Sequence, residues 1–64
     1  MLTETEIGTI AETMDTRLGE TAIAYAMLQA QWAGDTGDDL RVKDWSRIAA
    51  YLDRMHTLDR ERAT

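Results

Sequence analysis

Sixty-four residues, of which twelve are acidic and seven basic, give this chain a net charge of −5, with no cysteine and one histidine. A chain of this length forms one domain and buries only about 60% of the surface that its unfolded form exposes, so we predict a single domain over residues 1–64 that needs extra stabilisation. Disulfides are excluded and a lone histidine offers no pair of zinc ligands, which leaves oligomerisation or regular helix packing.

The first predicted helix covers residues 4–18. Thr3 and Glu6 have the spacing of a capping box, in which each side chain bonds the other residue's amide. Apolar residues then recur at helical spacing and form one stripe: Ile7, Ile10, Ala11, Met14 and Leu18. Gly19 suits the left-handed residue that commonly follows a helix. We expect the helix to end there, and a single helix bent at Gly19 is the alternative.

The second predicted helix covers residues 20–33, with Gly34 as its stop, and is apolar nearly all round. Its two apolar sides comprise Leu18, Ala22, Tyr25 and Trp32 on one, and Ile23, Met27 and Ala30 on the other. A helix of this kind needs burial on all sides, which a three-helix chain cannot supply. The alanines at 22, 26, 30 and 33 allow another helix to approach closely. We therefore expect a second copy or a partner protein to cover this helix.

The third predicted helix covers residues 40–60 and follows a turn of glycine and aspartate at residues 34–39. Asp38 or Asp39 can cap it, or Asp44 can cap a shorter version. Its apolar stripe consists of Trp45, Ile48, Ala49, Leu52 and Met55. The three patterns predict an all-α fold, a small bundle of three helices that homodimerisation through the second helix would complete.

The candidate catalytic and metal-binding motifs of this sequence lack the structural context that their chemistry requires. Asp35-Thr36-Gly37 matches the aspartic protease triplet. It follows a helix pattern, however, so we interpret it as a turn. The aspartates of this loop lack the ligand register of an EF-hand. Ser46 has no histidine at helical spacing to activate it, and His56 reads as a half-buried histidine near a helix end. We predict a protein that is not an enzyme and holds no metal or other cofactor.

The N-terminus and the longest apolar run bear on the compartment. The first six residues are acidic where a secretory signal is basic and then apolar. The apolar-rich run at residues 22–33 is shorter than the roughly 20 residues that a membrane span needs. We predict a cytoplasmic protein without a membrane partner.

Charge is distributed unevenly along the chain. Residues 1–39 hold eight acids and one base, whereas residues 40–64 hold four acids and six bases. Three bases share one side of the third helix, as in a helix-turn-helix protein that binds DNA: Lys43, Arg47 and Arg54. The net charge of −5 would repel phosphates everywhere except along that edge, so we expect no direct binding to nucleic acid.

Four threonines, Thr5, Thr9, Thr13 and Thr16, share the outer side of the first helix. Threonine is a mediocre helix former, so its repetition on one surface is not explained by helix propensity. Either the face is merely solvated or it is a recognition surface.

In size, acidity and lack of any catalytic constellation, the chain resembles small proteins that phages and mobile elements encode against host defences, anti-CRISPR proteins and DNA mimics among them. The acids of residues 4–20 and of the 35–39 loop carry this resemblance. It implies a non-catalytic inhibitor that occupies a nucleic-acid-binding surface of a host defence complex such as a CRISPR effector, a partner with a basic surface. The partner-binding residues that it implies are Glu12, Asp15, Glu20, Asp35, Asp38 and Asp39.

Two alternatives stay open at the level of sequence. The first is a homodimeric helical adaptor or regulator, such as an antitoxin or virion component, in which the second helix forms the dimer core. The second is the helix-turn-helix DNA binder.

Overall fold

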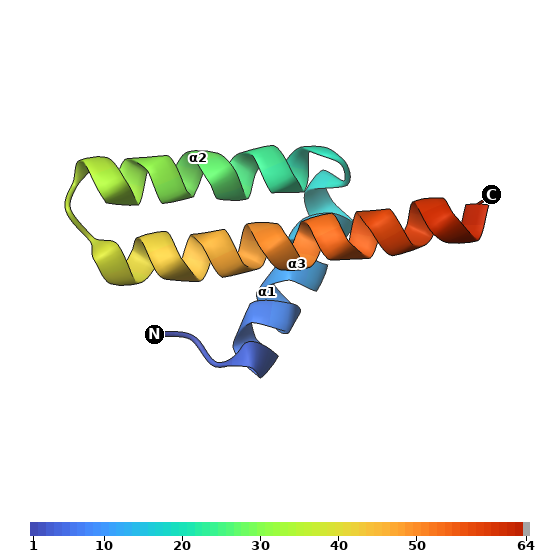
Figure 1. Ribbon diagram of the computed structural model, residues 1–64, viewed down its shortest axis with the longest axis horizontal. Coiled ribbons are helices and arrows are strands. Elements are labelled where there is room, and N and C mark those ends of the chain that lie inside the picture. Colours follow the sequence, from blue (N-terminus) through green and yellow to red (C-terminus); the bar gives the residue numbers. More distant parts are fainter. Residues whose placement is uncertain (64) are drawn as a thin grey trace.

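The computed structural model describes residues 1–63, without the side chains at 59, 60, 62 and 63, and consists of three helices (Figure 1). They are α1 (Glu4–Leu18), α2 (Thr21–Asp35) and α3 (Asp39–Ala63), and no strand occurs in residues 1–63. Helices α2 and α3 run antiparallel and side by side, while α1 lies at an angle to this pair (Figure 1). The predicted all-α bundle of three helices is confirmed.

Helix α1 has the bounds that its end signals predict. The Glu6 amide donates to Thr3 Oγ1 at 3.2 Å, and the Thr3 amide donates to Glu6 Oε1 at 3.1 Å, which completes the capping box. At the other end Gly19 has a φ of 57°, a value that favours glycine and stops the helix. Helices α1 and α2 are therefore separate, and the single bent helix is wrong.

The connection between α2 and α3 corrects the predicted end of α2. Gly34 lies inside the helix, and Gly37 is the glycine with positive φ, at 79°. The amides of Gly37 and Asp38 donate to the carbonyls of Gly34 (3.1 Å) and Ala33 (2.8 Å), the bond pattern of a Schellman motif. Asp38 then caps α3 by accepting the Arg41 amide at 3.2 Å. Either glycine could end the helix as far as the local sequence is concerned. Gly37 takes the positive φ because the chain reverses there to begin α3.

The core lies where the three helices meet and contains few large side chains. Its buried members are Ile7, Ala11, Ala22, Ala26, Ile48 and Leu52. The partly buried residues around it include Ile10 and Met14 of α1 and Trp45 and Ala49 of α3, as the stripes predict. Leu18 departs from its predicted stripe, since it is 41% exposed at the very end of α1, beyond the contact with the other helices.

Helix α2 packs mainly on α3, and it does so through alanine. Ala22 and Ala26 are completely buried in the core with Ile48 and Leu52 of α3. The close approach that the alanines allow is thus used within the chain. Ile23 is partly buried against this core, whereas the other large apolar side chains of α2 are exposed: Tyr25, Met27, Leu28 and Trp32.

Candidate interaction surface

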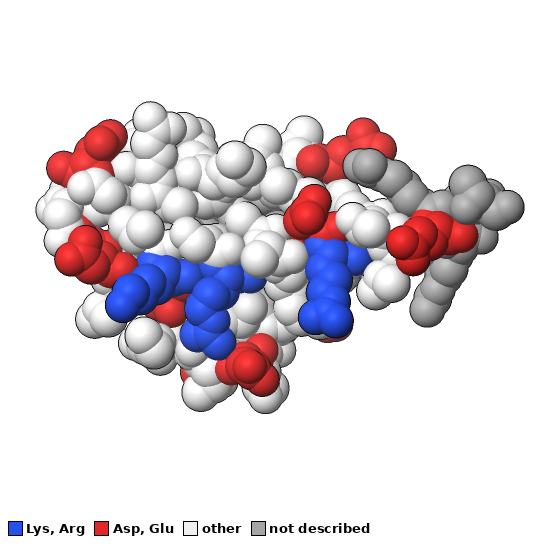
Figure 2. Space-filling view, viewed as in Figure 1, with Lys and Arg blue, Asp and Glu red and all other residues white. Residues whose placement is uncertain are grey.

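The six acidic residues implied as a partner site form two separate groups. Glu12 and Asp15 lie on α1, and Glu20 lies in the turn that follows it. Asp35, Asp38 and Asp39 lie at the opposite end of α2, whose fifteen residues span about 22 Å. Figure 2 shows acidic side chains at several separate places, including both ends of the molecule, with basic and uncharged surface between them. The fold does not bring the six residues together as one acidic patch.

Asp15 is engaged inside the molecule. Its Oδ1 lies 2.7 Å from Nε2 of His56, and the two side chains are 33% and 17% exposed. This contact fastens α1 to α3 and confirms the half-buried position predicted for His56. No local pattern indicates this pairing, because the two residues are 41 positions apart.

Asp38 also has a structural role, since it caps α3 and lies 3.4 Å from Nε of Arg41. The remaining four acids, Glu12, Glu20, Asp35 and Asp39, are exposed. Exposed carboxylates of this kind influence the approach of a charged partner more than they fix its position.

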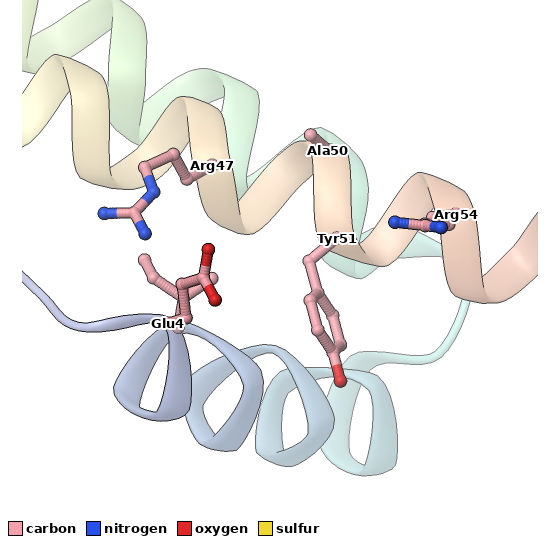
Figure 3. Close-up of a pocket in the computed structure, with 6 residues that line it drawn as sticks. Glu4, Arg47, Ala50, Tyr51 and Arg54 are labelled. Carbon is pink, nitrogen blue, oxygen red and sulfur yellow. The ribbon is translucent and has the colours of Figure 1, made fainter.

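The basic side chains of α3 form a row across one face of the molecule (Figure 2). Two of them, Arg47 and Arg54, line a hollow of about 400 Å³ between α1 and α3, together with Glu4 and Tyr51 (Figure 3). Arg47 Nη1 also donates to the Leu2 carbonyl at 2.9 Å. Glu4 therefore places a carboxylate beside the row, and Arg47 holds the N-terminal segment in place.

The arrangement of α2 and α3 bears on the helix-turn-helix alternative. In that motif two helices meet at about 90–120°, so that the second can enter the major groove. Helices α2 and α3 instead lie side by side and antiparallel (Figure 1). The basic row stands on a helix whose N-terminal part is paired with α2 and whose C-terminal part extends beyond it.

The threonine face of α1 uses its hydroxyl groups within the helix. Thr9, Thr13 and Thr16 donate to the carbonyls of Thr5, Thr9 and Glu12 at 3.0, 2.9 and 3.0 Å. Back-bonding of this kind occupies the hydroxyl protons. The face presents mainly methyl groups to a partner and few free donors.

The largest exposed apolar side chains of α2 form a second kind of surface, which we call the aromatic strip: Tyr25, Leu28 and Trp32. Their exposed fractions are 45%, 50% and 63%, and their spacing places them along one side of the helix. The Tyr25 ring meets Trp45 of α3 edge to face, with 6.0 Å between centroids and 72° between planes. Trp32 and Trp45 line a hollow of about 190 Å³ beside the strip.

The apolar pattern places Tyr25 and Trp32 on one side of the helix but does not mark them as a site. A helix that is apolar all round gives no indication of which side packs inward. Side-chain size could have indicated the inner side, because only the alanines of α2 are small enough for close contact between two helices.

Two further findings concern other kinds of site. Among the side chains that the structure describes, no three histidine, aspartate or glutamate groups are placed to hold a metal ion. Within residues 1–63, no helix combines the length and apolar character needed to cross a membrane.

Comparison of the chain with protein-family models, with curated proteins and with solved structures found no match.

Proposed function

We propose that this protein is a non-catalytic binding protein that docks the aromatic strip of α2 on a partner protein, at a surface that otherwise holds single-stranded nucleic acid. The observation that carries the proposal is the exposure of Tyr25, Leu28 and Trp32, which the fold leaves uncovered. Contiguous exposed apolar surface marks interaction sites, and tyrosine and tryptophan are enriched among the residues that dominate binding energy.

The charges around the strip define the chemistry of the partner. No lysine or arginine occurs from Leu18 to Leu40, whereas Glu20 and Asp35 flank the two ends of α2. The base that lines the hollow beside Trp32, Arg41 of α3, is paired with Asp38. Surfaces for single-stranded nucleic acid combine a basic groove with apolar platforms on which bases stack. An apolar strip between two acidic ends is the complement of such a surface. A host defence complex such as a CRISPR effector is the first target to test, in line with the resemblance drawn from size and charge.

The decisive test compares the strip with the basic row in the same binding assay. Tagged wild-type protein and the Trp32→Ala variant are used to capture partners from bacterial lysate, and a captured, purified complex is then titrated with each. We expect Trp32→Ala to weaken binding by tenfold or more, on the order expected for an interfacial tryptophan. Lys43→Ala, at an exposed position of α3 outside the strip, is the control and should bind the partner as the wild type does. Equal binding by Trp32→Ala and wild type would sink the proposal.

Competition tests the identity of the surface. Single-stranded oligonucleotide added to the complex should displace the protein, because both would occupy the same groove. Binding should also weaken as salt rises, since exposed carboxylates contribute through screened attraction. If saturating oligonucleotide does not displace the protein, the protein still binds its partner, but at a surface other than the one that holds nucleic acid.

A further inference from the structure

A second apolar surface lies on the other flank of α2, in the groove between α2 and α3. Trp32 and Met27 are separated by about 140° around the helix axis, so this groove and the aromatic strip face different directions. Its volume is about 440 Å³, and it is lined by Ile23, Met27 and Ala30 of α2 and by Ser46, Ala49, Ala50 and Asp53 of α3. The groove has two unlike walls, because the large apolar side chains, Ile23 and Met27, come from α2, whereas α3 supplies Ser46, Ala49, Ala50 and the charged Asp53.

We propose that this groove binds a second copy of the chain and forms a two-fold symmetric dimer with a four-helix core. A symmetric interface uses the same patch twice, so the patch must be its own complement. A two-fold axis along the groove lays α2 of one copy over α3 of the other. Met27, which is 61% exposed in the single chain, then lies over the small side chains at Ala49 and Ala50 of the second copy.

The charges of the two helices are complementary in the same arrangement. Helix α2 carries acids at its ends, Glu20 and Asp35. Helix α3 carries the acid Asp53 in the groove wall and the exposed bases Lys43 and Arg54 beside the groove, so the pairs form at the rim of the interface. Because α2 and α3 are antiparallel, the Glu20 end of one copy meets the Arg54 end of the other, and Asp35 meets Lys43. The acids are about 22 Å apart along α2 and the bases about 16 Å along α3. Lysine and arginine side chains are long enough to close the difference.

The exposed area of the single chain fits an interface of ordinary size. The molecule exposes 4858 Å², whereas a compact monomer of its mass exposes about 4,100 Å². The excess is roughly 700 Å², and a stable interface buries about 800 Å² on each partner. The excess also includes the part of α3 that extends beyond α2, and a second copy in the groove would cover the remainder of it.

Mass in solution tests the proposal. Light scattering across micromolar concentrations should give twice the 7.2 kDa of one chain. Met27→Glu places an unpaired charge in the interface and should raise the dimer dissociation constant by about a hundredfold or more. Leu28→Glu is the matched control, since it introduces the same charge at a neighbouring exposed position of α2 outside the groove, and it should remain dimeric. Circular dichroism verifies that both variants keep their helices.

Charge exchange distinguishes a second copy from any other occupant. Lys43→Glu and Asp35→Lys should each weaken the dimer, and the two changes combined in one chain should restore it, because the pair forms between copies. A monomeric wild type, a dimer that survives Met27→Glu, or a double variant no tighter than the single ones would each overturn the proposal. The inference is separable from the proposed function, because Leu28→Glu should lose the partner protein and keep the dimer.

Discussion

Helix α2 has small side chains on the side that faces the core and large apolar ones on the outside, which is the reverse of the usual arrangement in a small protein. The side that faces the core carries alanine, with Ala22 and Ala26 fully buried, whereas Tyr25 and Trp32 are about half exposed or more on the outside. Large apolar residues normally supply the core, since the free energy of burial grows with apolar area. Alanine gains little from burial but lets two helices approach closely. The inner side of α2 therefore allows α2 and α3 to pack closely, and the outer sides of α2 are available for binding.

The large side chains of the core come from the other two helices. Ile48 and Leu52 of α3 are 2% and 0% exposed, and Ile7 of α1 is 4% exposed. Stability is thus concentrated in a few residues opposite the alanines. The comparison predicts that changes to these residues or to the alanines unfold the protein, while changes to the outer residues of α2 leave it folded.

Leu52→Ala should have the largest effect. Truncation of a fully buried leucine costs about 2–5 kcal/mol, which is a large part of the 5–15 kcal/mol of a typical domain. We expect most of the chain to unfold at room temperature, or its urea midpoint to fall sharply, as followed by circular dichroism. A loss below about 1 kcal/mol would show that the core can collapse around the deletion and that stability is spread more evenly.

Ala26→Leu should have an intermediate effect and tests the two sides of α2 directly. The added methyl groups would push α2 and α3 apart, and overpacking of this kind costs about 1–3 kcal/mol. The reverse change on the outer side, Leu28→Ala, should alter the free energy of unfolding by no more than about 0.5 kcal/mol. Urea unfolding of both variants measures the contrast. Equal effects would mean that the outer side of α2 contributes as much to the fold as the inner one.

Glu6→Gln should have the smallest effect, and only through pH. The Thr3 backbone amide and then the Thr3 hydroxyl hold the pKa of Glu6 below its ordinary value. A lowered pKa in the folded state stabilises the protein above the unfolded-state pKa, and this contribution disappears as pH falls through the folded-state pKa. The urea midpoint of Glu6→Gln should therefore lie below that of wild type at neutral pH and approach it in acid. A difference independent of pH would show that the carboxylate's charge plays no part in the cap.

Local signals were sufficient for the helix ends of α1 and for the apolar stripes of α1 and α3. The capping pair Thr3 and Glu6 and the terminal Gly19 act within a few residues of one another, so their effect can be read directly from the chain. The end of α2 was misplaced because Gly34 and Gly37 carry the same local signal. The choice between them depends on where α3 must start in order to pack against α2.

By itself, the sequence determined that this protein is helical, where α1 begins and ends, and which stripe of α3 faces inward. The tertiary structure alone decided that α3 covers the alanine side of α2, that Asp15 bonds His56, and that the acidic residues separate into two groups. The reason is physical. Capping and periodicity arise from contacts a few residues apart, whereas the side that a helix buries is set by which distant helix approaches it and how closely.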